Sequence, residues 1–307
     1  MPVTYPPAPV TISGDIESIN RFLQSPTLLT RRLRTLAENR FIADALLTGR
    51  YTLQGGSVIY EQNETLYADR AVEAVNPGSE YPLTTISTGP AAVASAVKWG
   101  QDSMVYDEAI KRLLIDPVNR ALTKLVNNVV QKVDSVALAA IASSVSQTVA
   151  ATAAWTPGTA STNPLLDIEL AVANIRALNQ GYDPDTVVVS DVKYAHLMNN
   201  ATVLSAFRRE DPQNPVYTGS LPGPLAGLRV LTSPNIPVAN SAFILDSKVL
   251  GGMADEDLGG PGYSGQVMGV EGKAIRREEN DGWRLRARRV TVPVVIESNA
   301  AYIITGI

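Results

Sequence analysis

The sequence of 307 residues contains no cysteine and a single histidine. The lack of cysteine excludes disulfide bonds, thiolate metal ligands and a cysteine nucleophile. The histidine, His196, lies in a predicted helix near Tyr194 and Met198, where a structural role is the simpler interpretation. A Gly-x-Ser-x-Gly nucleophile elbow is also missing. We therefore expect no catalytic residues, no cofactor and no metal ligands, and a protein that is not an enzyme.

Two short segments have part of a ligand-binding motif but lack the rest of it. Asp255-Glu256-Asp257 offers oxygen ligands to a hard cation, yet it lacks the alternating spacing of a calcium loop. An exposed acidic loop is the simpler interpretation. Gly259-Gly260-Pro261-Gly262 is not followed by Lys-Ser/Thr, as a phosphate-binding loop would be.

Charged residues are scarce, at 18%, and the net charge is only −4. A dedicated nucleic-acid-binding protein would carry a basic surface, so this class is not expected. Apolar runs of membrane-spanning length are also missing, because residues 136–155 are interrupted by serine, glutamine and threonine. The first residues lack the basic-then-apolar pattern of a signal peptide. We expect a globular protein that does not cross a membrane.

The first third of the chain divides into an arm, a helical segment and a polar ribbon. The first dozen residues are rich in proline, which is typical of an extended arm. Apolar spacing predicts helix over 15–47, interrupted near Pro26 and stopped by Gly49. Residues 51–99 have few apolar side chains and a turn at Asn76-Pro77-Gly78-Ser79, which predicts a long two-stranded ribbon. Such a ribbon needs another surface to lie on.

A long helix is the clearest predicted element. Asp116-Pro117 combines a capping carboxylate with proline at the first helical position. Apolar residues then recur at spacings of three and four through Val118, Leu122, Leu125, Val126, Val129, Val133, Val136 and Ile141. A helix to residue 143 would be on the order of 40 Å long. The Ser/Ala/Thr-rich residues 143–162 predict a loop or domain junction.

The remaining residues predict shorter elements, and the fold class is α+β. Helices are expected over 163–178, stopped by Gly181, and after the cap Ser190-Asp191. Strands are expected at 186–189, 230–231 and 243–245, and one-face-buried strands over 283–304. Residues 251–265 predict a glycine-rich surface loop.

Several of these segments, in this order, resemble the Hong Kong 97-like major capsid proteins of tailed bacteriophages. The residues that carry the resemblance are Val75-Asn76-Pro77-Gly78-Ser79-Glu80-Tyr81-Pro82, Lys98-Trp99-Gly100, Asp134, the segment 225–237, and Trp283-Arg284-Leu285-Arg286 with Pro293 and Ala300. The resemblance implies a phage capsid fold with five parts. These are an N-terminal arm and helix (1–50), an extended β-hairpin loop (51–99), a peripheral domain with a spine helix (100–160), an axial α/β domain (161–275), and strands that return to the peripheral domain (276–307).

The resemblance implies self-assembly into hexamers and pentamers of an icosahedral shell around double-stranded DNA. The implied partners are further copies of the chain, a portal protein, a separate scaffolding protein and DNA by non-specific proximity, with decoration proteins left open. The implied location is the virion, after assembly in the host cytoplasm. An encapsulin-like compartment shell is the alternative within the fold. The helix–strand alternation over 166–246 also leaves an α/β enzyme as an alternative of another class.

Two features depart from the family pattern. Cross-linking members use a lysine on the extended loop, but residues 51–97 contain none. We therefore expect no isopeptide bond there. Some members carry a long N-terminal scaffolding segment that a protease removes, whereas only about fifty residues precede the loop here. We expect a chain that is not processed.

Charged side chains on the loop and on one helix are the candidate inter-subunit contacts. They are Glu61, Glu64, Asp69, Arg70, Glu73, Glu80, Arg31, Arg32 and Arg34. A second basic cluster comprises Arg284, Arg286, Arg288 and Arg289. For the basic clusters, a solvated surface, ion pairs between subunits and incidental contact with DNA all remain open.

Overall fold

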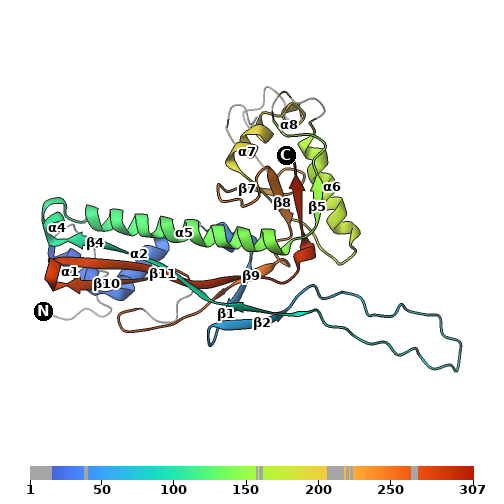
Figure 1. The fold of residues 1–307 in the computed structure, drawn as a ribbon, viewed down its shortest axis with the longest axis horizontal. Helices are drawn as coiled ribbons and strands as arrows, with labels where there is room; N and C mark the ends of the chain where they lie inside the picture. Colours follow the sequence, from blue (N-terminus) through green and yellow to red (C-terminus); the bar gives the residue numbers. More distant parts are fainter. Residues whose placement is uncertain are drawn as a thin grey trace, which may run out of the picture. The chain divides into compact units, whose positions relative to one another are not determined.

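The computed structural model describes residues 16–37, 41–156, 158, 162–205, 218, 221, 224–263 and 269–307. The chain forms two compact units, and each is built from segments that are distant in the sequence. The first unit comprises Met1–Phe41, Ala96–Val133 and Asp255–Thr291, and the second comprises Ile42–Ser95, Asp134–Ala254 and Val292–Ile307. Both mix helices and strands (Figure 1), which confirms the α+β class.

The sheet of the first unit is built around β11 (Gly282–Val295), a strand that runs on into the second unit. In the first unit it pairs antiparallel with β10 (Glu271–Arg277) on one side and with β4 (Val97–Tyr106) on the other. The short 3-10 helix η1 (Glu278–Asn280) connects β10 to β11. The register sets Arg286 opposite Asp102 of β4, so a basic and an acidic side chain become cross-strand neighbours.

Helices α1 (Ile16–Gln24), α2 (Pro26–Ala37) and α4 (Asp107–Leu113) also belong to the first unit. The interruption predicted at Pro26 is confirmed, because proline begins α2 where its missing N–H costs no hydrogen bond. Gly272 of β10 lets α2 approach closely: a Cβ there would lie 2.1 Å from Cδ1 of the buried Leu33. The Oγ1 atom of Thr30 donates to the carbonyl of Gly272 at 3.3 Å.

The predicted long helix is present as α5 (Asp116–Ser144), 29 residues or about 43 Å at 1.5 Å per residue. Seven of its eight predicted apolar positions are buried, and Val136 is partly buried. By length and composition alone α5 could cross a membrane, but core helices of soluble proteins pass the same test. The buried apolar stripe, with exposed Lys124 on another face, favours a core helix.

A mixed five-stranded sheet forms the core of the second unit. Its order is β5 (Thr148–Ala150), β12 (Ala301–Thr305), β8 (Ser241–Leu245), β6 (Thr186–Val189) and β7 (Arg229–Thr232). Helices α6 (Pro164–Ala177), α7 (Asp191–Met198) and α8 (Ala201–Ser205) belong to the same unit. The predicted caps are confirmed: Asn163 accepts from the N–H of Leu166, and Ser190 accepts from that of Lys193. The predicted loop over 143–162 is wrong at β5, which pairs with β12.

Two glycine-based predictions are wrong near β1 (Gly49–Thr52) and β9 (Gly251–Asp255). Helix α3 (Ala43–Leu46) ends before Gly49, which begins β1. Residues 251–255, predicted as surface loop, form a completely buried strand. Glycine is needed there because a Cβ at Gly251 would lie 2.1 Å from the carbonyl oxygen of Val294. These glycines allow close backbone approach and do not mark a turn.

The predicted ribbon is paired only at its base. Strand β2 (Ser57–Glu61) pairs antiparallel with β3 (Ala91–Ser95) through five residue pairs. Residues 62–90 contain no strand and form a long loop beyond that pairing (Figure 1). The predicted turn is present, since the N–H of Ser79 donates to the carbonyl of Asn76. The ends of the predicted range belong elsewhere: Tyr51 lies in β1 and Trp99 in β4.

Candidate assembly surface

The extended loop, residues 62–90, is anchored at its base by hydrogen bonds to another segment of the second unit, residues 295–298. Gln62 Nε2 donates to the carbonyl of Val295 at 3.2 Å. Asn63 Oδ1 accepts from the N–H and the hydroxyl of Ser298 at 2.9 and 3.0 Å. The base of the loop is therefore part of the folded subunit.

Beyond its base, the two halves of the loop are joined again by hydrogen bonds between residues 69–70 and 84–87, which we call the neck. Asp69 accepts from the hydroxyls of Thr85 and Ser87 at 2.8 and 2.6 Å. The Ser87 hydroxyl, followed by that of Thr85, lowers the pKa of Asp69. The N–H of Arg70 donates to Thr84 Oγ1 at 3.3 Å. These side-chain bonds replace the β-ladder that the sequence predicted here.

Large apolar side chains are exposed at and beyond the neck. The exposed fractions are 101% for Val72, 82% for Tyr81, 91% for Leu83 and 82% for Ile86. Isolated exposed apolar residues are ordinary on a protein surface, but several close together in one segment mark an interaction site. The single subunit therefore leaves these four apolar side chains uncovered.

The candidate contact residues fall into three groups in the structure. Arg70 and Glu73 pair with each other at 2.9 Å and are half-exposed, and Asp69 accepts a hydrogen bond from Thr85 in the neck. Glu61, Glu64 and Glu80 have exposed side chains. Arg31, Arg32 and Arg34 are exposed on α2 of the first unit.

The arginines of β11 all pair within the chain, so a reading of them as inter-subunit contacts is not supported. Arg288 binds Glu271 at 2.8 Å, and Arg289 binds Asp255 at 3.1 Å. The Arg289 side chain is only 2% exposed. Burial raises the pKa of Glu271 even though Arg288 opposes the shift. The prediction of an exposed acidic loop is therefore wrong at Asp255, and the predicted alternation of β11 fails at Arg288 and Arg289.

Arg284 and Arg286 share the carboxylate of Asp102 on the neighbouring strand β4. Arg286 donates from Nε at 2.7 Å and from Nη2 at 2.8 Å, a two-point contact. The hydrogen bond from Arg286 lowers the pKa of Asp102 against the opposing effect of burial. The sequence offers no signal for these partners, because they depend on the strand register.

One carboxylate of the long helix α5 links that helix to α3 in the second unit. Asp134 is buried and accepts from the N–H of Ala43 at 2.9 Å and of Ile42 at 3.3 Å. It thereby caps the start of α3. Asp134 is also one of the residues that carry the resemblance noted in the sequence, and this structural role accounts for an acidic side chain there.

The described residues do not form a metal centre. Within them, no group of three His, Cys, Asp or Glu side chains could hold a metal ion. His196 is half-buried, and its Nδ1 atom has no hydrogen-bond partner in the described part of the chain.

Comparisons with known proteins identify the family of the chain. The model of the family described as phage capsid protein matches residues 90–304. No curated protein matches the sequence. Among solved structures, a phage-related protein from Bordetella bronchiseptica RB50 is similar with a TM-score of 0.61 and 11% identity, covering 91% of this chain and 96% of that one.

Two further structures extend the comparison. The capsid of cyanophage P-SCSP1u is similar with a TM-score of 0.60 and 13% identity, covering 83% of this chain and 85% of that one. An encapsulin from Synechococcus elongatus PCC 7942 is similar with a TM-score of 0.51 and 13% identity, covering 88% of each chain. These likenesses establish the fold, and the family model extends over most of the sequence. The chain belongs to the phage capsid protein family, a family of structural proteins, and is a major capsid protein with the Hong Kong 97-like fold.

Proposed function

We propose that copies of this chain form the hexamers and pentamers of an icosahedral shell around double-stranded DNA, and that the extended loop joins neighbouring copies. The observation that carries the proposal is the apolar surface of the loop, with Val72, Tyr81, Leu83 and Ile86 exposed in the single subunit. Full burial of a large apolar side chain contributes about 1.5–3 kcal/mol. Repetition of this contact around a ring of subunits would stabilise the shell.

Charge supports the same arrangement. The loop and its base carry the exposed carboxylates Glu61, Glu64 and Glu80, whereas α2 carries the exposed Arg31, Arg32 and Arg34. We propose that these two groups meet between copies. Exposed ion pairs contribute only about 0–1 kcal/mol each. They would therefore orient neighbouring subunits but add little to the free energy of association. Salt should weaken this part of the contact.

The decisive experiment removes the loop tip and keeps its neck. Residues 71–83 are replaced by Gly-Ser, which joins Arg70 to Thr84, two residues already linked by a hydrogen bond of 3.3 Å. We expect unchanged circular dichroism and thermal melting of the subunit, and no shells by sedimentation and electron microscopy. Normal shells from the shortened chain would contradict the proposal, and an unfolded product would show that the tip belongs to the core.

A matched pair of point variants tests whether shells need the apolar side chains of the loop in particular, or exposed apolar side chains in general. Leu83→Ser removes an apolar side chain that is 91% exposed, and Val192→Ser removes one that is 63% exposed on α7. We expect the first change to reduce the yield of shells strongly and the second to leave it unchanged.

The remaining assignments rest on membership of the family. We propose assembly in the host cytoplasm with a portal protein and a separate scaffolding protein, and contact with DNA through proximity alone. We also propose the division into arm, extended loop, peripheral domain, axial domain and returning strands. A catalytic role is not part of the proposal.

The structural likeness to an encapsulin supports a second candidate, a protein compartment without a genome. The family whose model matches this chain is described as phage capsid protein, which favours the phage shell. The contents of purified particles discriminate the two candidates: nuclease-protected double-stranded DNA indicates a virion, and a co-purified protein without DNA indicates a compartment.

A further inference from the structure

The sheet of the first unit has two different faces. Helix α5 runs along one of them (Figure 1), where Asn128 Nδ2 donates to Oε1 of Gln101 in β4 at 2.7 Å. Successive side chains of a strand point to opposite faces, so Lys98, Gly100 and Asp102 of β4 lie on the face away from α5. Three arginines of β11 share that face, because the register sets two of them opposite Gly100 and Asp102. The face away from α5 therefore carries a cluster of basic side chains.

A pocket with a volume of about 390 Å³ lies on this face, over β4 and β11. Its size is within the range of roughly 300–1,000 Å³ that is common for ligand pockets. Lys98 and three arginines, Arg284, Arg286 and Arg288, line it. Gly100 keeps the space open, since a Cβ there would lie 3.0 Å from the Cβ of Arg288. We call this the β4–β11 pocket.

The arginines of the β4–β11 pocket outnumber the carboxylates that pair with them. Arg284 and Arg286 share the single carboxylate of Asp102, and Arg288 binds Glu271. Three guanidinium groups therefore meet two carboxylates. One positive charge is left in excess.

Lys98 adds a second positive charge to the pocket wall. Its side chain is exposed, and no carboxylate of the described residues forms an ion pair with it. Beyond the wall, Asp257 beside Glu271 and Lys273 next to β11 add one charge of each sign, which leaves the balance unchanged. The pocket therefore has two positive charges in excess.

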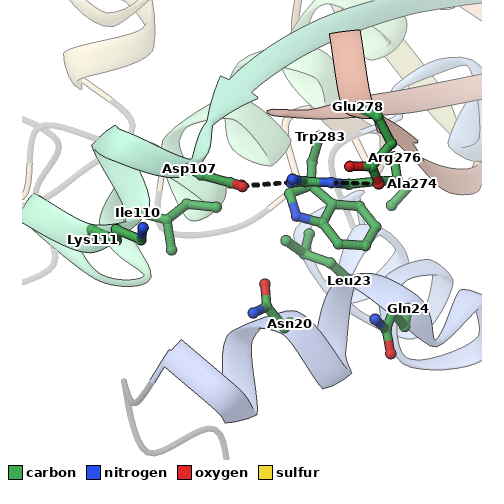
Figure 2. Close-up of a pocket in the computed structure, with 10 residues that line it drawn as sticks. All are labelled: Asn20, Leu23, Gln24, Asp107, Ile110, Lys111, Ala274, Arg276, Glu278 and Trp283. Carbon is green, nitrogen blue, oxygen red and sulfur yellow. Dashed lines mark hydrogen bonds and ion pairs between the residues drawn. The ribbon is translucent and has the colours of Figure 1, made fainter. Parts of the chain in front are cut away.

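A larger pocket of the same unit shows the contrast (Figure 2). Its wall contains two cations, Arg276 and Lys111, and two carboxylates, Asp107 and Glu278. Arg276 contacts both carboxylates, at 2.7 and 3.1 Å. Because its charges balance, that pocket has no preference for an anion, whereas the β4–β11 pocket does.

Hydrogen-bond donors also remain in the β4–β11 pocket. Arg286 uses Nε and Nη2 to bind Asp102, and Arg288 uses Nε to bind Glu271 and Nη2 to bind a backbone carbonyl. Each keeps Nη1 for another acceptor. Guanidinium groups match the oxygens of phosphate, and a phosphate group carries about 1.5–2 negative charges at pH 7. We propose that the β4–β11 pocket binds a phosphate group through Lys98 and the arginines of β11.

Two sources could supply this group, free inorganic phosphate and the phosphodiester backbone of DNA, because the same side chains would recognise either. All the residues that line the pocket belong to one subunit. The site therefore does not depend on the proposed shell, and it can be tested with the full chain before assembly.

Equilibrium dialysis of the unassembled full chain against radiolabelled inorganic phosphate, at about 0.15 M sodium chloride, measures the binding. We expect saturable binding of one phosphate per chain. Lys98→Gln removes one of the two excess charges and a charged donor, and should weaken the affinity at least about tenfold. Lys124→Gln makes the same chemical change on the exposed face of α5, and should leave the affinity unchanged. Circular dichroism confirms that both variants fold.

Competition experiments then identify the source. A short DNA duplex that displaces the labelled phosphate from the unsubstituted chain would assign the site to the DNA backbone, and failure to displace it would assign the site to free phosphate. Displacement by N-acetylglutamate as readily as by unlabelled phosphate would assign the pocket to a protein carboxylate and overturn the proposal. The absence of saturable binding, or full affinity in Lys98→Gln, would also overturn it. None of these results bears on the proposed shell, because assembly does not enter the measurement.

Discussion

Asp102 illustrates how single residues organise the first unit. It holds two arginines of the neighbouring strand with one carboxylate, and this arrangement lowers its pKa below the usual value of 3.8. A carboxyl whose pKa is lower in the folded state binds a proton more readily when unfolded. Its contribution to stability is therefore present above about pH 4 and is lost as the pH falls through the lower, folded-state pKa.

The variant Asp102→Asn should reveal this dependence. Unassembled wild-type subunit should melt at a higher temperature than the variant at pH 7, and the difference should shrink as the pH falls below about 4, because the wild-type carboxyl becomes protonated. Thermal melts at pH 7, 4 and 3 measure it. A difference that stayed constant over this range would show that the ion pairs contribute nothing that depends on charge.

The residue scale is also where the sequence was least informative. Arg288 and Arg289 are adjacent in a basic run, which favours a solvated or inter-subunit role, yet both are buried against Glu271 and Asp255. Their partners lie 17 and 34 residues away, and the pairing of β11 with β10 and β9 brings them together.

At the scale of elements, α5 is the best test of the predicted packing. Val129 is 3% exposed on its buried stripe, whereas Lys124 is exposed. Val129→Asp would bury a charge without a partner, and should destabilise the subunit on the order of 4 kcal/mol, a large effect for one substitution.

Lys124→Gln is the matched control, since it changes a charge on the exposed face of the same helix. It should change the free energy of unfolding by no more than about 0.5 kcal/mol, as a surface substitution does. The comparison needs only the soluble yield and the melting temperature of each variant. Equal behaviour would mean that the buried face of α5 is placed wrongly.

Elements with a strong local signal were predictable, and elements defined by tertiary contacts were not. Asp116-Pro117 and regular apolar spacing predicted α5 to within one residue at its end, and Asn163 and Ser190 predicted the starts of α6 and α7. Strand β9 was missed because its glycines, which read as loop, serve close backbone packing. The pairing of the extended loop was overestimated because alternating polar residues do not distinguish a ladder from a loop closed by side chains.

At the scale of the whole molecule, the composition of the loop makes a prediction about the shell. Residues 51–97 contain no lysine, so the isopeptide bond that the resemblance to cross-linking capsids suggests cannot form there. Mature particles boiled in detergent should release one band near 32.8 kDa on a denaturing gel. A ladder of covalent multimers would contradict this. Shell stability would then depend on non-covalent burial over large interfaces.

The neck of the extended loop has a consequence for how such a shell could grow. Hydroxyls of Thr85 and Ser87 bind Asp69 within a single subunit, so the two halves of the loop are joined before any neighbour arrives. Conformational entropy is then lost when the chain folds, and less remains to be lost on association. A preorganised loop of this kind favours fast addition of subunits, because encounter does not have to wait for the segment to order.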